Sequence, residues 1–116
     1  MVINDIYGGS EMEQYVWNIA DVVKNNPILD DQKLTRTFLM DGTYCTALVV
    51  QAKPQKEPFI HIHKEHDEFL YILKGEGWVY IDDKKFKVKV GDFVYCPAGV
   101  EHGFFMSVKS IRLSIY

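Results

Sequence analysis

The chain has 116 residues, of which 47% are hydrophobic and 14% aromatic, so it can build one core but is too short for two domains of ordinary size. Acidic residues outnumber basic ones by 16 to 13, and the net charge of -3 argues against nucleic acid or an anionic membrane as partner and favours a small molecule. The sequence therefore predicts a single domain over residues 1–116, with an N-terminal extension at 1–33 and a β-barrel at 34–116.

The N-terminal extension has a mixed pattern. Its apolar residues within 11–25 follow a helical spacing, at Met12, Tyr15, Val16, Ile19, Val22 and Val23. Tyr15–Ile19 also fits a strand, and Asn18 can cap a short helix that ends before Pro27. We predict a strand over Tyr15–Ile19 followed by that short helix.

From Leu34 onward, β-branched and aromatic residues dominate. The first two predicted strands, Leu34–Met40 and Thr43–Gln51, flank Asp41-Gly42, a dipeptide that favours a type I′ hairpin turn. The stretch Ala52–Glu57 is the longest predicted loop. Further strands are predicted at Pro58–His63, Glu68–Leu73, Gly77–Ile81, Lys85–Val90, Phe93–Cys96, Gly103–Met106 and Lys109–Ile115. Many short strands separated by turn signals indicate a sandwich or a barrel.

The cysteines and the lack of targeting signals bear on the compartment. Cys45 and Cys96 are the two cysteines of the chain. The sequence has neither a charged-then-apolar leader nor an apolar run of about eighteen residues, the length that a membrane-spanning helix requires. We expect a cytoplasmic protein with no membrane partner, in which a reducing environment keeps both thiols free.

Two histidines in one predicted strand suggest a metal site. Side chains alternate between the faces of a strand, so His61 and His63 share a face, with Cα atoms about 6.6 to 6.8 Å apart. Glu68 has the wrong parity for the same straight strand. We therefore predict that Lys64–Asp67 reverses the chain in a hairpin and brings Glu68 opposite the two histidines.

A third histidine completes the predicted ligand set. Pro97 and Gly99 indicate a tight turn that aims His102, in place of a continuing strand, and a closed sheet would bring its ring close to the other three side chains. Three imidazoles and one carboxylate suit one divalent ion per chain, Fe, Mn, Ni, Cu or Zn, among which the sequence does not choose. An octahedral ion with four protein ligands keeps two positions open for water, dioxygen or a substrate.

These residues resemble the two motifs of the cupin superfamily. The first motif matches His61-x-His63, Glu68 and Gly75, and the second matches Gly91, Pro97-x-Gly99 and His102. The fifteen residues between Gly75 and Gly91 are typical of small microbial single-domain cupins. The resemblance implies an all-β double-stranded β-helix, or jelly-roll, barrel with a short N-terminal helix. The chain departs from the family pattern at Gln55, where the family has glycine, and at Met106, where it has asparagine.

The alternation of side chains along the strands predicts further residues of a pocket around the ion. Apolar candidates that share a face with the predicted ligands are Phe59, Leu70, Ile72, Phe104 and Met106, and Cys96 is a candidate for the pocket wall. Arg36 and Tyr44 can present a guanidinium and a hydroxyl to an anionic substrate, or lie on the surface. His66 is either a solvated loop residue or a proton shuttle at the mouth of the cavity.

Three classes of function remain open. The resemblance to cupin dioxygenases, isomerases and decarboxylases implies a metal-dependent enzyme that acts on a small oxygen-bearing metabolite, with His61, His63, Glu68 and His102 as metal ligands. The alternatives are a barrel that binds or senses a metabolite without turning it over, and a structural barrel that the metal only stabilises. Cupin-like barrels commonly form two-fold dimers, and Tyr15 and Trp17 could meet a second subunit, so a homodimer is expected.

Overall fold

The protein is described by a computed structural model that covers the backbone of residues 3–7 and the whole of residues 14–116. The elements in chain order are β1 (Ile3–Tyr7), α1 (Ile19–Asn25), β2 (Leu34–Asp41), β3 (Thr46–Ala52), β4 (Phe59–His61), β5 (Glu68–Lys74), β6 (Gly77–Ile81), β7 (Lys84–Val88), β8 (Phe93–Cys96), β9 (His102–Met106) and β10 (Ser110–Ile115). The strands predicted at Gly77–Ile81 and Phe93–Cys96 have these same bounds. Most of the others differ by one to three residues at an end.

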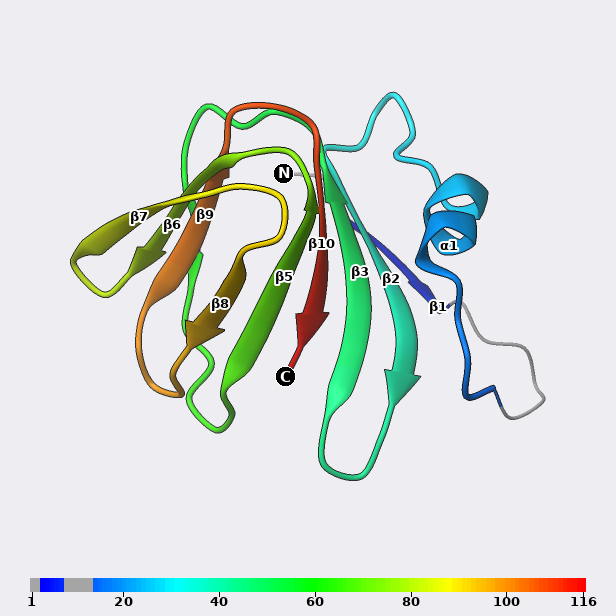
Figure 1. The fold of residues 1–116 in the computed structure, drawn as a ribbon, viewed down its shortest axis with the longest axis horizontal. Helices are drawn as coiled ribbons and strands as arrows, with labels where there is room; N and C mark the ends of the chain where they lie inside the picture. Colours follow the sequence, from blue (N-terminus) through cyan, green and yellow to red (C-terminus); the bar gives the residue numbers. More distant parts are fainter. Residues whose placement is uncertain (1–2, 8–13) are drawn as a thin grey trace.

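The strands form two sheets (Figure 1). The larger sheet has six strands in the order β1-β2-β3-β10-β5-β8, and the smaller has four in the order β4-β9-β6-β7. All pairs are antiparallel except β1 and β2, which run parallel. Strands that are distant in sequence, such as β3 and β10, thus become neighbours. This arrangement confirms the predicted all-β class with one short helix.

The N-terminal extension differs in part from the prediction. The helix is confirmed, because α1 begins at Ile19 and the Asn18 side chain accepts a hydrogen bond of 3.0 Å from the Asp21 N–H. The predicted strand at Tyr15–Ile19 is wrong, since residues 14–18 have no regular structure and the cap commits Ile19 to the helix. Strand β1 was not predicted, and Met12 lies outside the described residues.

The helix contacts β3, and Figure 1 shows it beyond β2, at the β1–β2 side of the larger sheet. Gln51, which is buried on β3, donates from Nε2 to the carbonyl oxygen of Asn26 at 2.8 Å. This hydrogen bond joins the end of α1 to the sheet. None of the helices in the described part of the chain is long and apolar enough to cross a membrane.

The predicted type I′ turn at Asp41-Gly42 is wrong. The connection between β2 and β3 is a longer loop in which Gly42 N donates to Cys45 O at 2.8 Å. At the base of the loop, Thr46 Oγ1 donates to Asp41 Oδ1 at 2.6 Å, and the register of β2 against β3 shifts between Phe38 and Met40. The extra residue in the bulge and the side-chain hydrogen bond together close a wider turn than a two-residue hairpin needs.

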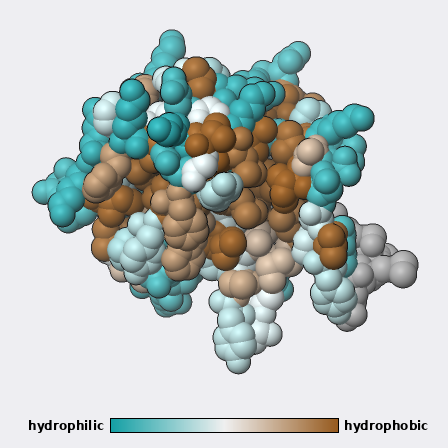
Figure 2. All heavy atoms as spheres, in the orientation of Figure 1, coloured by the Kyte–Doolittle hydropathy of each residue, from teal (hydrophilic) through white to brown (hydrophobic). Residues whose placement is uncertain are grey.

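Apolar side chains from both sheets form the main hydrophobic cluster. Its buried members are Leu70, Ile72, Val79, Val88, Val94, Cys96, Phe104 and Met106. A second cluster lies on the larger sheet and contains Leu34, Leu48, Val50 and Ala52. Full burial of each large apolar side chain stabilises the fold by about 1.5 to 3 kcal/mol. Figure 2 shows hydrophobic side chains across the middle of one face, bordered by hydrophilic side chains along its upper edge.

Candidate metal centre

The structure brings His61, His63, Glu68 and His102 together. Each of the four side chains offers a ligand atom, and these atoms lie within 4.8 Å of one another. The Nε2 atoms of His61, His63 and His102 lie 3.6, 3.5 and 2.9 Å from the same carboxylate oxygen, Glu68 Oε1. The four predicted ligands thus converge on one point.

The two sheets contribute to this cluster from opposite sides. His61 on β4 pairs directly with His102 on β9 in the smaller sheet, whereas Glu68 begins β5 in the larger sheet. The predicted hairpin at Lys64–Asp67 is therefore wrong, because this segment crosses from one sheet to the other. His63 lies two residues beyond the end of β4, and the connection carries it toward the larger sheet.

The prediction for His102 also needs correction. We expected the turn at Pro97 and Gly99 to place His102 outside a strand, but His102 is the first residue of β9. The turn instead contacts the loop that carries His63. Gly99 N donates to His63 O at 2.7 Å, and the positive φ of 78° at Gly99 is a conformation that glycine adopts without strain.

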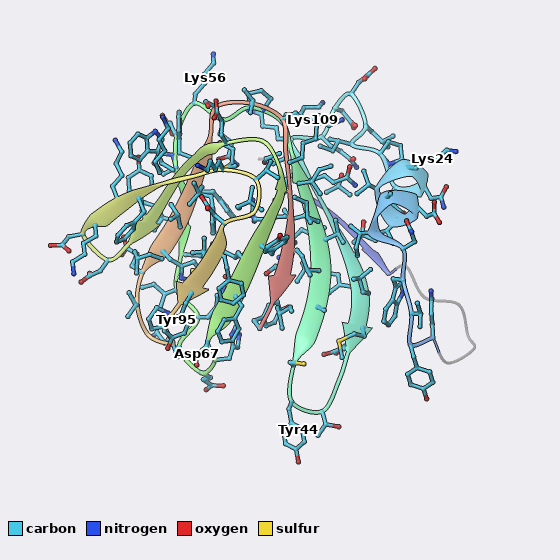
Figure 3. All side chains as sticks on the ribbon, in the orientation of Figure 1. Lys24, Tyr44, Lys56, Asp67, Tyr95 and Lys109 are labelled. Atoms are coloured by element: carbon cyan, nitrogen blue, oxygen red, sulfur yellow. The ribbon has the colours of Figure 1, made fainter. Side chains whose placement is uncertain are left out.

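A second contact joins the same two loops. Asp67 Oδ1 accepts a hydrogen bond of 2.9 Å from Ala98 N and one of 3.4 Å from the Tyr95 hydroxyl. Figure 3 shows Asp67 and Tyr95 side by side, where β5 begins and β8 ends. The loop that carries His63 is thereby held against the loop that precedes His102. Hydrogen bonds between the loops, rather than one continuous strand, set the position of His63.

Two hydrogen bonds orient the deeper ligands. Ser114 Oγ donates to Glu68 Oε2 at 2.6 Å, which leaves Oε1 for the histidines. His102 Nδ1 lies 3.2 Å from Val100 O and its Nε2 lies 2.9 Å from Glu68 Oε1, so the ring is held between a carbonyl and the carboxylate. Such partners fix the tautomer and the orientation of metal-bound histidines in other proteins.

The electrostatics keep the carboxylate ionised. Burial by itself raises the pKa of Glu68, but hydrogen bonds from His102, His61 and Ser114 outweigh it and hold the pKa well below its usual range. Burial also lowers the pKa of His63, and the neighbouring histidines add to that effect while Glu68 opposes it. One anionic oxygen and a neutral imidazole are the protonation states that bind a metal ion.

The geometry fits a single transition-metal ion. Ligand atoms that each lie about 2.0 to 2.2 Å from one ion are about 3 to 3.5 Å apart when they occupy neighbouring positions. The three distances from Glu68 Oε1 fall close to that range. His102 Nε2 lies 2.9 Å from Glu68 Oε1, and either a proton on Nε2 or a metal ion between the two atoms accounts for this contact. The donor set, three nitrogens and one oxygen, suits the ions expected from the sequence.

A pocket of about 240 Å³ opens beside the cluster. Its lining includes His61, His63 and Glu68, and also the predicted pocket residues Arg36, Phe59 and Phe104. Other candidates lie elsewhere: Leu70, Ile72, Cys96 and Met106 belong to the main hydrophobic cluster and do not line this pocket. Tyr44 is 98% exposed at the tip of the loop between β2 and β3, where it points away from the molecule (Figure 3).

His66 lies at the edge of the cluster without joining it. Its ring centroid lies 4.5 Å from that of His63 and 4.7 Å from that of Tyr116. The Tyr116 ring also stacks on His63, with 12° between the ring planes. Tyr116 lines the pocket and His66 does not, so the two rings pack around the outer side of His63.

Sequence reasoning missed several residues that line the pocket. They are Leu34, Leu48, Val50, Arg112, Ser114 and Tyr116. Arg112 and Ser114 alternate with Ile111 and Leu113 along β10, and we expected no role for the polar face of that strand. The structure buries it: Arg112 is 7% exposed and Ser114 is 2% exposed. A polar alternation that includes one of two arginines in the whole sequence was the available signal.

Comparison with known proteins agrees with this architecture. Residues 48–111 match the Cupin domain family. Acireductone dioxygenase from Rattus norvegicus is 31% identical over 112 residues, a stretch that covers 85% of this chain and 63% of that protein. The matched stretches span less than two thirds of each curated relative.

Solved structures show the same fold. An RmlC-like cupin from Shewanella frigidimarina has a TM-score of 0.72 at 22% identity, covering 90% of this chain and 89% of that one. An uncharacterized conserved protein with a double-stranded β-helix domain from Klebsiella pneumoniae has a TM-score of 0.75 at 19% identity, with 89% of each chain covered. These likenesses confirm the double-stranded β-helix. From the family match, the two sheets and the cluster of three histidines and one glutamate, the chain belongs to the cupin family.

Proposed function

We propose that this cupin binds one divalent transition-metal ion through His61, His63, Glu68 and His102, and acts as a metal-dependent enzyme on a small oxygen-bearing metabolite. The observation that carries the proposal is the approach of three Nε2 atoms to one buried carboxylate oxygen at 2.9 to 3.6 Å beside an open pocket. A site with four protein ligands leaves coordination positions free for a substrate. Fe, Mn, Ni, Cu and Zn all suit this donor set.

The pocket lining supports a role in substrate binding. Phe59 on β4 pairs with Phe104 on β9. This pair lies two residues along the strands from the pair His61 and His102. These rings, together with the aliphatic residues of the larger sheet, would orient a small molecule and limit the access of water. A volume of 240 Å³ corresponds to roughly eight water molecules, which restricts the ligand to a small metabolite.

The reaction type rests on weaker support. A metal ion in such a site supplies either Lewis-acid polarisation of a substrate oxygen or a place to bring dioxygen and substrate together. The relative called acireductone dioxygenase favours an oxygen-dependent reaction over isomerisation or decarboxylation. The protein's own residues would hold the substrate, fix the carboxylate through Ser114 and keep His102 in one tautomer.

One observation favours a metabolite-binding or sensing protein as the second candidate. Besides the four ligands, the described residues that line the pocket include no aspartate, glutamate or histidine that could act as a general acid or base near neutral pH. A protein without such a group could still use its metal for the whole reaction, so we place the enzyme first. The third alternative, a barrel that the metal only stabilises, does not account for the pocket beside the cluster.

Metal content and oxygen consumption test the proposal. Protein purified without added metal should contain close to one transition-metal ion per chain by elemental analysis, and His102→Ala should contain less than a tenth of that. His66→Ala is the matched control, because it removes a neighbouring imidazole that is not a ligand. Fe(II)-loaded protein should then consume dioxygen with at least one compound of a metabolite screen. Ligand binding without oxygen uptake or product would identify a sensor instead.

We further propose that the protein is cytoplasmic and forms a homodimer. Cys45 is exposed, Cys96 is buried and both are free, as we expect of a protein that works in the reducing cytoplasm. For the homodimer, Tyr15 is 78% exposed and Val16 is 82% exposed on the segment before α1, where they offer apolar surface to a second copy. Light scattering should give twice the mass of the chain, and a mass of 13.5 kDa would refute the dimer.

A further inference from the structure

Arg112 is a charged side chain buried without a hydrogen-bond partner for two of its nitrogens. It is 7% exposed on β10, and among the described residues neither Nε nor Nη1 has a hydrogen-bond partner. Burial lowers the pKa of the guanidinium to about 10, while Glu68 and Cys96 act in the opposite direction, so the group stays charged at neutral pH. Buried N–H donors that lack an acceptor destabilise a protein, so Nε and Nη1 of Arg112 are available to a ligand that supplies acceptor atoms.

The position of Arg112 connects it to the metal centre. It precedes Ser114 by two residues, so both side chains leave the same face of β10, and Ser114 donates to Glu68. Both residues line the pocket that contains His61 and His63. The guanidinium therefore lies on the same wall of the pocket as the hydroxyl that donates to Glu68.

The contact of Arg112 with Phe104 leaves its hydrogen-bonding edge available. The guanidinium carbon lies 4.4 Å from the centroid of the Phe104 ring. Stacking on a ring uses the flat face of the guanidinium, whereas its N–H groups lie in the plane and point sideways. The ring thus holds the group in place without satisfying its donors.

A second arginine lies in the same row of the sheet. Val50 on β3 pairs with Arg36 on one side and with Arg112 on the other, so the three side chains point to the same face. These are the two arginines of the sequence, and both line the pocket. The eleven lysines of the chain do not line it.

Arginine supplies the cationic side chains among the described residues that line the pocket. Arg112 lies within electrostatic reach of Glu68, the acidic side chain of that lining, and a bound divalent ion would add two positive charges. A small anion would neutralise part of this charge. A carboxylate also matches the planar donors of arginine in shape, and it can contact a metal ion through the same or a second oxygen.

From these observations we infer that the pocket binds a small carboxylic acid whose carboxylate is held by Arg112, next to the metal centre. This inference names the ligand class for the proposed metal-dependent function and rests on it for the second contact of the ligand. The size of the pocket restricts the acid to about ten non-hydrogen atoms.

Calorimetry with malonate, a dicarboxylate, and malonamide, its uncharged isostere, tests the inference. Each compound is titrated into metal-free and Mn(II)-loaded protein. Wild-type protein should bind malonate at least tenfold more tightly than malonamide even without metal, because the guanidinium is present in both forms. Arg112→Met should weaken malonate binding at least tenfold in both forms, and Arg112→Lys should give an intermediate affinity, since it keeps the charge and loses the planar fork.

Lys109→Met is the matched control. Lys109 lies directly before β10, is exposed and does not line the pocket, so its loss removes one positive charge and should change the affinity less than twofold. Malonate binding by Arg112→Met within twofold of wild type, or no preference for malonate over malonamide, overturns the inference. If Arg112→Met does not fold, the test uses Arg112→Gln in its place. The preference of the wild-type protein for malonate over malonamide is then the second measurement.

The two proposals fail in different ways. Wild-type protein that takes up no metal but binds malonate through Arg112 would refute the metal-dependent function and leave the carboxylate site standing. Protein that takes up one metal ion and loses no malonate affinity in Arg112→Met would refute the carboxylate site and leave the metal centre standing.

Discussion

The hydroxyl of Ser114 donates a hydrogen bond of 2.6 Å to Glu68 Oε2, and both residues are buried. The two residues lie on neighbouring strands of the larger sheet, β10 and β5. Oε2 is engaged by the hydroxyl, so the other oxygen, Oε1, is the one that faces the three imidazoles. A residue outside the ligand set therefore decides which oxygen is available to a metal ion.

Replacing Ser114 with alanine is expected to reduce metal affinity by about 10- to 100-fold, because the carboxylate loses the partner that orients it. Competition with a chromogenic chelator for Zn(II) or Mn(II) measures the change. Ser110→Ala is the matched control: Ser110 is buried on the same strand, but its hydroxyl has no partner among the described residues. An equal loss in both variants would show that the orientation of Glu68 is unimportant.

Metal-free protein should lose stability in acid. The pKa of Glu68 lies below its usual value of 4.5 in the folded state, so its contribution is present above that pH and is lost as the pH falls below it. The pKa of His63 is lowered from 6.5, so the folded state binds fewer protons there and stability begins to fall below pH 6.5. Urea unfolding at a series of pH values measures both changes.

Glu68→Gln separates the two contributions. The variant should retain a loss of stability near pH 6 and show a weaker dependence on pH below 4.5, since glutamine does not titrate. An acid dependence below pH 4.5 as steep as that of wild type would contradict the assignment to Glu68.

The two cysteines should differ in reactivity. Burial, reinforced by the negative charge of Glu68, raises the pKa of Cys96 to about 12, so almost none of this thiol is ionised at neutral pH. Cys45 is exposed. Mass spectrometry after treatment with iodoacetamide should show one fast modification, and Cys45→Ser should remove it. Cys96 should react at least about 100-fold more slowly in the folded protein. Rapid modification of Cys96 would mean that the core opens at that site.

Two glycines should respond differently to alanine. A Cβ at Gly77 would collide with the Phe105 carbonyl oxygen and lie 2.8 Å from Met106 Cα, and these are backbone atoms that cannot move aside. We expect Gly77→Ala to cost about 3 kcal/mol. Gly91 has a φ of 93° and open space around it, so Gly91→Ala should cost only about 1 kcal/mol through backbone strain. Urea unfolding compares the two variants, and the reverse order would contradict the steric argument.

The strand pattern was predictable from sequence because it depends on local spacing. The grouping of His61, His63, Glu68 and His102 was predictable because they match the two cupin motifs. Glycine and proline mark the ends of short strands such as Gly77–Ile81, and parity places alternate residues on one face. The sheet to which each strand belongs was not predictable in this way. A loop of six residues separates β4 from β5, and whether it forms a hairpin or crosses between sheets depends on long-range packing.

The inward face of β10 illustrates a second limit. Ser110, Arg112 and Ser114 form the polar face of that strand, which a period of two assigns to solvent. The structure turns this face inward because Ser114 finds a partner in Glu68 and Arg112 stacks on Phe104, both from other strands. Polar residues that are buried for binding therefore look like surface residues in sequence.

The two departures from the cupin motifs turn out to contact each other. Gln55 N donates to Met106 O at 2.9 Å, and Met106 N lies 3.4 Å from Gln55 Oε1. We expected Met106 to line the pocket, but it is 1% exposed in the main hydrophobic cluster. Gln55 and Met106 therefore join the loop before β4 to β9, and their effect on the pocket is indirect.

The origin of the ligands from opposite sheets has a mechanical consequence. His61 and His102 belong to one wall of the sandwich and Glu68 to the other, and His102 follows Glu68 by 34 positions in the sequence. A cation held by all three would act as a removable cross-link between the walls. Its release and the separation of the walls would then be coupled, so chelation should speed amide exchange along β5 and β9 together.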